Sequence, residues 1–412
     1  DTQKIGFLPW RCRATALINV IWPLHRCFMN TTALPNMLDR DPTTMALEDI
    51  DISHIDLWKN DSKWPFFKRL RDEAPVHYCR DSEYGAFWSV TRFEDIMAVE
   101  RNWEIFSSYP RISISDPIEG STFSAPTFIA MDPPTHDEQR KTVQGAVAPQ
   151  NLKKLEATIR HRAGKILDDL PTDETFNWVE KVSVELTTQM LATLFDFPFE
   201  DRSKLTRWSD IVFARLGEGI IDSHQQRQDE LMECLAYFTR LWKEREDNPV
   251  GTDFISMMIR SDATRHLSPQ EYLGNILLLI VGGNDTTRNS ISGGVLALNQ
   301  NPIEYQKLRD NPGVIPNMVS EIIRWVTPLA HMRRTVTKDF EFNGQQLHAG
   351  DKVIMWYASG NRDERSIKDP DLFKIDREDA RKHVSFGFGL HRCMGNRMAE
   401  MQLRVLWEEI QK

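Results

Sequence analysis

The chain has 412 residues, of which 41% are hydrophobic and 27% charged, a composition typical of a soluble globular protein with one large or two medium domains. Its 51 basic and 60 acidic residues give a formal net charge of −9, which argues against nucleic-acid binding. The five cysteines are scattered and form no C-x-x-C pair, which excludes a disulfide framework and a zinc site and favours a reducing cytosol.

The first part of the chain shows no strong hydrophobic period, and we interpret residues 1–40 as an extension of unknown role. Its longest apolar run, residues 14–22, is shorter than the roughly 20 apolar residues that a membrane-spanning helix needs. Arg11, Arg13 and Arg26 flank this run, so weak association with a membrane surface stays open. No clear cleavage site of a signal peptide is present, and we expect a cytoplasmic protein.

The next elements alternate between helical and strand-like patterns. Residues 46–71 look like a helical lead-in, and residues 76–91, which are rich in aromatic side chains, read as a strand pair. The stretch 151–267 is mostly helical, with amphipathic segments at 152–170, 179–194 and 228–245. Residues 351–357 form a short β-like run. The pattern predicts a mainly α fold with small β-sheets.

A long helix is predicted from the segment SPQE at residues 268–271, which combines a serine cap, an early proline and a capping-box glutamate, to about Asn301. It is apolar around much of its circumference, so we expect it to be buried. Its middle contains the segment GGNDTTR (282–288), whose residues are poor helix formers. One interpretation is a close helix crossing with an ion pair between Asp285 and Arg288. The other is a widened turn that opens a groove for a flat cofactor, lined by an acid and an alcohol.

The segment FGFGLHRCMG (386–395) places Cys393 in a glycine-rich loop before a helix predicted over residues 394–410. A helix N-terminus lowers the pKa of a thiol, and the thiolate is the form that binds metal. The glycines allow a flat, bulky group to approach the backbone. The plainer alternative is that Cys393 is a small buried hydrophobic residue.

This loop has the form F-x-x-G-x-x-x-C-x-G and resembles the haem-binding loop of the cytochromes P-450, the haem-thiolate monooxygenases. The resemblance covers about residues 45–412 and includes the family's oxygen-activation motif at 282–286. It implies the cytochrome P-450 fold, with haem b between the long central helix and the cysteine-loop helix and with Cys393 as the iron ligand. The family normally continues through a further β-hairpin, so we expect residues 41–412 to form a monooxygenase domain that lacks this hairpin, or the chain to be a fragment.

The same resemblance assigns roles to single residues. Asp285 is implied as a proton relay and Thr286 as the hydrogen-bonding partner of oxygen during its activation. A buried structural charge cluster is implied for Glu321, Arg324 and Arg377. The implied partners of the haem and its propionates are His136, Arg140, Arg334, His391, Phe386, Gly387 and Gly395. Arg333, beside Arg334, is the alternative propionate partner.

Segments 283–290 and 387–407 look like those of a bacterial subgroup that hydroxylates alkanes and fatty acids at the terminal carbon. Analogy with the family implies a hydrophobic substrate pocket at Phe128, Ile129, Ile280, Gly283, Leu329, Ala330 and Met332. Ordinary core packing is the alternative for these positions. The alternative functions are hydroxylation of another hydrophobic substrate, such as a terpene or steroid, and a haem-based sensor or carrier.

The chain contains no visible flavin- or iron–sulfur-binding segment, so the two electrons of each turnover need a separate donor. The resemblance implies a ferredoxin with its reductase, O2 as co-substrate, and NAD(P)H used only through the reductase. An acidic ferredoxin needs a basic docking surface. The candidate surface around the cysteine loop consists of Lys141, Arg381, Lys382, Arg392, Arg397 and Arg404, and the alternative is an ordinary solvated face.

Overall fold

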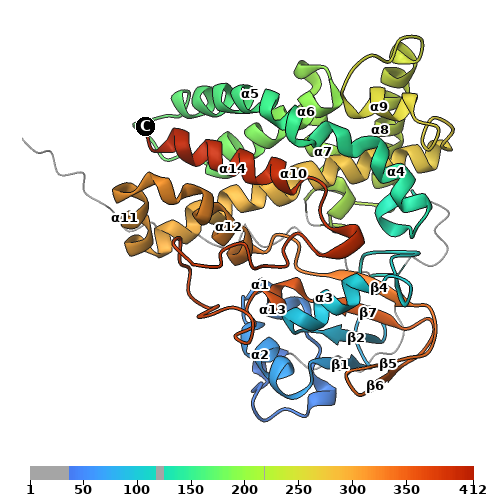
Figure 1. Cartoon of the computed structure of the whole chain (residues 1–412), viewed down its shortest axis with the longest axis vertical. Helices are drawn as coiled ribbons and strands as arrows, with labels where there is room; N and C mark the ends of the chain where they lie inside the picture. Colours follow the sequence, from blue (N-terminus) through green and yellow to red (C-terminus); the bar gives the residue numbers. More distant parts are fainter. Residues whose placement is uncertain (1–36, 117–124, 218) are drawn as a thin grey trace, which may run out of the picture.

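The computed structural model of the chain describes residues 37–116, 125–217 and 219–412. Most helices gather on one side of the molecule, and the small sheets lie on the other side (Figure 1). The predicted fold class, mainly α with small β-sheets, is therefore confirmed. The extension predicted at residues 1–40 lies outside the described residues, apart from residues 37–40.

The helical side is built around a large apolar core of Leu, Ile, Phe and Met side chains. Its α-helices are α4 (Thr135–Gln144), α5 (Pro149–Asp168), α6 (Glu185–Phe195), α7 (Ser203–Phe213), α8 (His224–Arg245), α9 (Phe254–Arg260), α10 (Pro269–Gln300), α11 (Pro302–Asp310), α12 (Ile315–Val326) and α14 (Asn396–Ile410). A π-helical turn, Val179–Val184, leads into α6. The predicted amphipathic segments correspond to α5, to this turn with α6, and to α8. None of the described helices combines the length and the apolarity needed to cross a membrane.

In the described residues, the sheet side contains four α-helices, one mixed five-stranded sheet and one antiparallel two-stranded sheet. The helices are α1 (Ile55–Lys59), α2 (Trp64–Glu73), α3 (Phe93–Arg101) and α13 (Tyr357–Gly360). The five-stranded sheet has the order β1 (Val76–Cys79), β2 (Phe87–Val90), β7 (Lys352–Met355), β4 (Met332–Val336) and β3 (Phe106–Ser107). The second sheet pairs β5 (Phe340–Phe342) with β6 (Gln345–Leu347). The predicted strand pair is β1–β2, and the predicted lead-in is split into α1 and α2.

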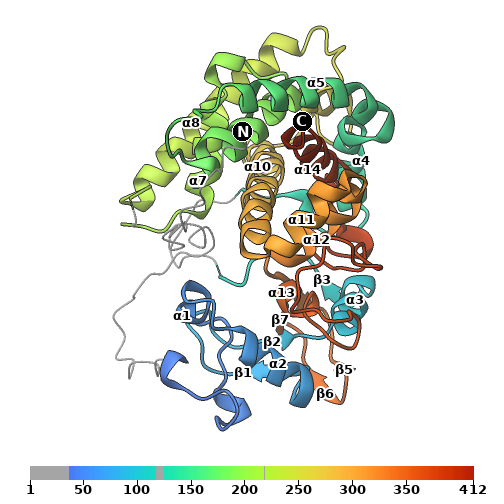
Figure 2. The ribbon, with the colours of Figure 1, turned by 90° about the vertical axis from the view of Figure 1, so that its left-hand side faces the viewer.

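Helix α10 crosses the helical side and packs against α6, α7, α12 and α14 (Figures 1 and 2). Its predicted capping box is present, because Ser268 and Glu271 each accept a hydrogen bond from the other's backbone N–H. The helix continues without a break through residues 282–288, so the expected widened turn is not present as an interruption. Helix α14 begins at Asn396, two residues later than expected, because the cysteine loop extends to Gly395.

The charge cluster on α12 holds the long segment that leads to the cysteine loop. Glu321 and Arg324 are fully buried. The Glu321 carboxylate accepts from Nε of Arg324 at 2.7 Å and from Nε of Arg377 at 2.9 Å. Arg324 also donates to the backbone carbonyl of Asn361. The implied contact of Arg377 with the pair is therefore present in the fold.

We predict that Glu321→Gln lowers the free energy of unfolding by about 3–5 kcal/mol, because it leaves two buried guanidinium groups without a countercharge. The exposed Glu378, on the same segment, provides the control variant Glu378→Gln, which should change the free energy by less than about 0.5 kcal/mol. Chemical denaturation of both variants measures the difference. Equal stability of the two variants would contradict a supporting role of the cluster.

Candidate active site

The loop that carries Cys393 is closed by its own backbone. The Cys393 N–H donates to the carbonyl of Phe386 at 2.8 Å. Gly387 and Gly389 have φ values of 66° and 64°, a conformation that side chains rarely adopt. Within the described residues, the side chain of Cys393 is exposed whereas Cys79 and Cys234 are buried. The loop therefore presents one accessible sulfur.

The pKa of the Cys393 thiol differs from the value expected from the sequence. Although solvent reaches the residue, protein atoms crowd the sulfur, and this burial raises the pKa of Cys393 above its ordinary value. The backbone N–H groups of Gly395 and Asn396 and the charges of Arg140 and Arg392 act in the opposite direction. The expected net lowering of the pKa by the helix N-terminus is not found, because the protein atoms around the sulfur leave it less contact with water and this outweighs the opposing groups.

Four nitrogen-bearing side chains converge beside this loop, and we call them the nitrogen cluster: His136, Arg140, Arg334 and His391. The rings of His136 and His391 lie 4.2 Å apart between centroids. Arg140 donates to the carbonyl of Arg392 at 2.6 Å. Burial, followed by the charges of Arg334, His136 and Arg140, lowers the pKa of His391 to about 2. Three segments distant in sequence thus place all four implied propionate partners together.

Several atoms of the nitrogen cluster lack a partner. Nε2 of His136 and both ring nitrogens of His391 are buried without a hydrogen bond. Buried polar groups are nearly always hydrogen-bonded in proteins, so these atoms indicate a ligand that supplies acceptor oxygens. Arg333 does not share the cluster: its Nη1 pairs with Asp116 at 2.6 Å, because neighbouring residues of β4 point to opposite faces.

Helix α10 has an open face at Gly282. This glycine is exposed, and a Cβ atom added to it would meet no atom within 4 Å. One turn later, the hydroxyl of Thr286 donates to the carbonyl of Gly282 at 3.3 Å and remains partly exposed. A Cβ atom on Gly283 would instead approach Cδ1 of Leu191 to 2.9 Å. Gly282, rather than the predicted Gly283, therefore borders the opening.

Asp285 is buried next to this face. Its Oδ1 accepts from Nη2 of Arg288 at 2.6 Å, and Nη1 of Arg288 donates to Asp210 of α7 at 3.0 Å. The other oxygen of Asp285 accepts no hydrogen bond of good geometry, although the hydroxyl of Ser209 is close enough to oppose the rise of its pKa. Burial raises the pKa of Asp285 to about 6, and Asp210 adds to the rise while Arg288 opposes it. The ion pair of the structural interpretation forms, and one carboxylate oxygen still remains available for a proton.

The chain of charges from Asp285 leads outward. The side chain of Asp285 is 6% exposed, whereas that of Asp210 is 32% exposed. Arg288 bridges them and is itself nearly buried. The arrangement connects the interior acid to solvent through two side chains on two helices.

The predicted pocket residues divide into two groups. Phe128 lies in a 3₁₀ turn (Phe128–Ala130), and its backbone N–H donates to Oδ1 of Asn275 on α10 at 3.0 Å. The centroid of its ring lies 6.3 Å from that of His136. Ile129 is partly exposed next to it. The residues of the second group, Leu329, Ala330 and Met332, lie in or just before β4, with Leu329 and Met332 partly exposed. Ile280 is 0% exposed and packs in the core, so it does not border the opening as expected.

Gly274 explains how the segment with Phe128 reaches α10. A Cβ atom at this position would lie 2.1 Å from the carbonyl oxygen of Pro126. The backbone of residues 125–126 therefore lies directly on the helix, which no larger residue than glycine permits.

Only part of the candidate basic surface around the cysteine loop is free to dock an electron donor. Lys141, Arg381, Lys382, Arg392 and Arg397 are exposed. Arg404 instead pairs with Glu156 of α5 and with Glu408, each at 2.8 Å. It ties α14 to α5, so its charge is already compensated and it does not belong to the docking surface as expected.

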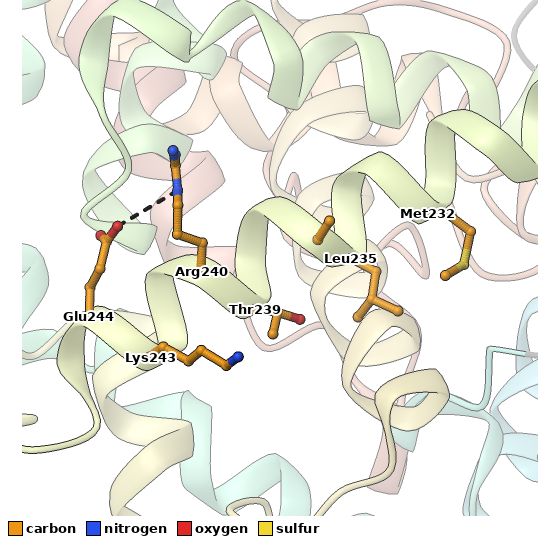
Figure 3. A pocket seen from close by; sticks show the side chains of 7 residues that line it. Met232, Leu235, Thr239, Arg240, Lys243 and Glu244 are labelled. Carbon is orange, nitrogen blue, oxygen red and sulfur yellow. Dashed lines mark ion pairs between the residues drawn. The ribbon is translucent and has the colours of Figure 1, made fainter.

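Two surface hollows lie apart from Cys393 and the nitrogen cluster. One, of about 690 Å3, lies along α8 and is lined by Met232, Leu235, Ala236, Thr239, Arg240, Lys243 and Glu244 (Figure 3). The ion pair between Arg240 and Glu244 lies at its end. Another, of about 500 Å3, lies between the start of α12 and residues 378–382. The second hollow is lined by Arg381 and Lys382 of the candidate docking surface, and neither hollow is lined by a residue predicted to hold haem, relay protons or bind substrate.

Residues that sequence reasoning missed surround the site. Asp210 carries no local signal, because its partner Arg288 is 78 residues away. Glu100, which contacts Arg334, and Tyr357, which contacts Glu100, are equally unmarked in the sequence. The glycine pair at 282–283 was recognised in the sequence. Which of the two glycines borders the opening depends on which face of α10 packs against α6, and the sequence does not show this.

The residues present fit haem. An accessible sulfur, buried nitrogens without acceptors and a helix face opened by glycine meet the needs of a flat iron cofactor with two carboxylates. In the described residues, no group of three or more His, Cys, Asp or Glu side chains could hold a metal ion. A single protein ligand to a metal is sufficient when a cofactor supplies the others.

We predict opposite behaviour for the two adjacent glycines of α10. Gly282→Ala should stabilise the protein by about 0.5–1 kcal/mol through helix propensity. Its methyl group should also weaken substrate binding about tenfold by entering the opening. Gly283→Ala should be about 1 kcal/mol less stable than Gly282→Ala because it crowds Leu191, and should leave substrate affinity unchanged. Denaturation measures the stability of the two variants, and spectroscopic titration measures their substrate affinity. Weaker substrate binding in Gly283→Ala than in Gly282→Ala would contradict this placement of the opening.

Comparison with known proteins extends these observations. The family model described as Cytochrome P450 matches residues 176–410. A linalool 8-monooxygenase from Pseudomonas putida is 34% identical over 88% of this chain and 91% of its own length. A methyl-branched lipid omega-hydroxylase from Mycobacterium bovis is 30% identical over 93% of this chain and 92% of its own length.

Two solved structures are more similar in sequence. Cytochrome P450-153 from Novosphingobium aromaticivorans is 48% identical, covers 88% of this chain and 91% of its own, and has a TM-score of 0.82. CYP153D17 from a Sphingomonas species is 45% identical, covers 89% of this chain and 92% of its own, and has a TM-score of 0.83.

Proposed function

Because the chain belongs to the cytochrome P450 family, whose members use haem b and O2, we propose that this monooxygenase hydroxylates the terminal carbon of medium-chain alkanes or fatty acids. The observation that carries the haem site is the accessible sulfur of Cys393 beside the unpartnered nitrogens of His136 and His391. A free thiol of this kind persists in a reducing compartment, and we place the enzyme in the cytoplasm.

Each part of the site has a separate task in holding the cofactor. When bound, the haem supplies the activation of O2, and a thiolate ligand increases the electron density that favours O–O cleavage. Cys393 would provide that ligand, and the nitrogen cluster would donate hydrogen bonds to the two propionates. Phe386, Gly387 and Gly395 would keep the loop close to the cofactor. A Cβ atom at Gly395 would meet no atom within 4 Å, so the space beside this residue is open.

Proton delivery is assigned to α10. The hydroxyl of Thr286 borders the opening at Gly282 and holds a proton there. The free oxygen of Asp285 exchanges protons, and its pKa of about 6 matches a group that is protonated for part of the time near neutral pH. Arg288 and Asp210 hold this carboxyl and connect it to solvent. A sensor or carrier has no need of this arrangement.

The substrate proposal is supported by apolar side chains and by similar proteins. Phe128, Ile129, Leu329, Ala330 and Met332 offer no charged group, so a hydrocarbon would bind by burial of apolar area, at about 25 cal/mol per Å2. One similar protein is named as a lipid omega-hydroxylase. Terminal attack requires that the chain end alone reaches the reacting centre, since internal C–H bonds are weaker.

Spectroscopic spin-state titration tests this proposal. Medium-chain alkanes and fatty acids should bind more tightly than linalool or a steroid, and mass spectrometry should locate the new hydroxyl group on the terminal carbon. Linalool and steroids are the informative competitors because similar proteins are named for them. If linalool or a steroid binds more tightly and is hydroxylated while alkanes are not oxidised, the proposed substrate class is wrong.

We propose a ferredoxin with its reductase as the electron donor. The exposed Arg392 and Arg397 flank the thiolate ligand, where an acidic partner would dock. The double variant Arg392→Glu with Arg397→Glu should lower ferredoxin-driven reduction about tenfold or more at low salt. The exposed Lys338, on the sheet side, provides the control Lys338→Glu, which should reduce the rate little. Equal rates for the double variant and the wild type would rule out this docking surface.

A further inference from the structure

Glu100, at the end of α3, forms a buried triad with Arg334 of β4 and Tyr357 of α13. Nη2 of Arg334 donates to Oε2 of Glu100 at 2.7 Å, and the hydroxyl of Tyr357 donates to Oε1. The Glu100 and Arg334 side chains are 1% and 3% exposed. Burial raises the pKa of Tyr357, which keeps the phenol protonated as a donor. Both oxygens of this buried carboxylate are therefore satisfied.

The triad touches the cysteine loop directly. A Cβ atom on Gly387 would lie 3.1 Å from Oε1 of Glu100 and 3.3 Å from the hydroxyl of Tyr357. A Cβ atom on Gly389 would lie 2.6 Å from the Glu100 carbonyl oxygen. The positive φ values of these two glycines occur where the loop passes this glutamate. The path of the loop and the position of Glu100 are thus coupled.

The triad also contains a member of the nitrogen cluster. Arg140 and Arg334 carry the permanent positive charges of that cluster. Arg334 is already paired with a carboxylate, whereas Arg140 donates to a neutral backbone carbonyl. One of the two charges expected to face the propionates is therefore compensated within the protein, and the end of the site near Arg334 is less positive than the sequence suggests.

We propose that Glu100 is a positioning residue that, with Tyr357, holds Arg334 and the cysteine loop and keeps the haem reduction potential low by compensating the Arg334 charge. The inference rests on the proposed haem function. A negative charge near a redox centre favours its oxidised, more positive form. The triad thereby limits how readily the iron is reduced, in addition to shaping the loop.

The isosteric variant Glu100→Gln tests this inference, because it keeps the size and one acceptor but removes the charge. In substrate-free protein, spectroelectrochemical titration should show a higher reduction potential, by about 59 mV or about tenfold in the one-electron equilibrium. Glu104→Gln is the matched control: Glu104 is close in sequence but exposed, so its removal should leave the potential unchanged. Tyr357→Phe keeps the charge and should shift the potential less than Glu100→Gln.

The double variant Glu100→Gln with Arg334→Gln restores the net charge and avoids an unpaired buried guanidinium. Its potential should return to within about threefold, in the equilibrium, of the wild-type value. This variant also keeps the test decisive if Glu100→Gln alone fails to retain haem. An unchanged potential in Glu100→Gln, or a double variant shifted as far as the single one, would overturn the inference.

The wild-type spectrum distinguishes a failure of the proposed haem function from a failure of the proposed role of Glu100. If the wild-type protein gives no thiolate–haem signal with carbon monoxide, the proposed function fails. If that signal is present and the potentials do not follow the charges, only the role of Glu100 fails.

Discussion

Cys393→Ser should remove the far red-shifted Soret band that the reduced, carbon monoxide-bound protein shows when a thiolate ligates the haem. Turnover should fall at least about a thousandfold, which corresponds to about 4 kcal/mol in the barrier. The physical reason is that a serine hydroxyl does not ionise at neutral pH and cannot supply the electron density of a thiolate. Difference spectroscopy of the dithionite-reduced protein makes the measurement.

A second cysteine provides the control for this experiment. Cys79 is buried in β1, with its sulfur 3.9 Å from the carbonyl of Asp81, so a serine hydroxyl has an acceptor at the same place. Cys79→Ser should retain the band and the turnover. A band that persists in Cys393→Ser, or one that is lost equally in Cys79→Ser, would overturn the assignment of Cys393 as the ligand.

The second large effect is expected on α10. Asp285→Asn and Thr286→Ala should each lower product formation about a hundredfold, within the range of a positioned acid or base, while haem content stays at the wild-type level. Asparagine preserves the shape of Asp285 but cannot exchange a proton, and alanine removes the hydroxyl at the opening. Thr286→Ser keeps the hydroxyl and should retain most of the activity. Product formation per haem makes the comparison; full activity in both disabling variants would exclude the proposed relay.

The pH dependence of stability checks whether Asp285 is a buried acid with a raised pKa. Its pKa is raised from 3.8 to about 6, so between these values the native state binds a proton that the unfolded chain has released. This carboxyl therefore stabilises the fold below about pH 4 and loses that contribution as the pH rises through about 6. Asp285→Asn should lack this loss. Denaturation curves of wild type and variant at several pH values should diverge across this window.

Local patterns predicted much of the architecture. The capping box at Ser268, the helix α10 and the strand pair β1–β2 follow from residues adjacent in sequence, and the structure contains each of them. The π-helical turn before α6 and the separation of α1 from α2 were not expected. Both depend on how each helix meets its neighbours, which propensity and periodicity do not describe.

Three expectations about the site were wrong for related reasons. The pKa of Cys393 is raised because burial outweighs the helix N-terminus. Ile280 is buried in the core and a Cβ atom on Gly283 would point toward α6, and only the orientation of α10 against its neighbours decides that. Arg404 is compensated by acidic side chains on α5 and α14. Each depends on atoms that lie far away in the sequence or on how much contact with water a group loses.

The sequence by itself determined the family and predicted the ligand and the relay pair, because all three depend on short runs of adjacent residues around Cys393 and Asp285 whose chemistry requires that order. The tertiary structure alone decided which charges remain available. Glu100 reaches Arg334 across 234 residues, and Asp210 reaches Arg288 across 78 residues. Such pairs form because folding buries at least one charged partner, as it does Arg334, Glu100 and Arg288, and an uncompensated buried charge is costly. No local pattern encodes which partners will meet.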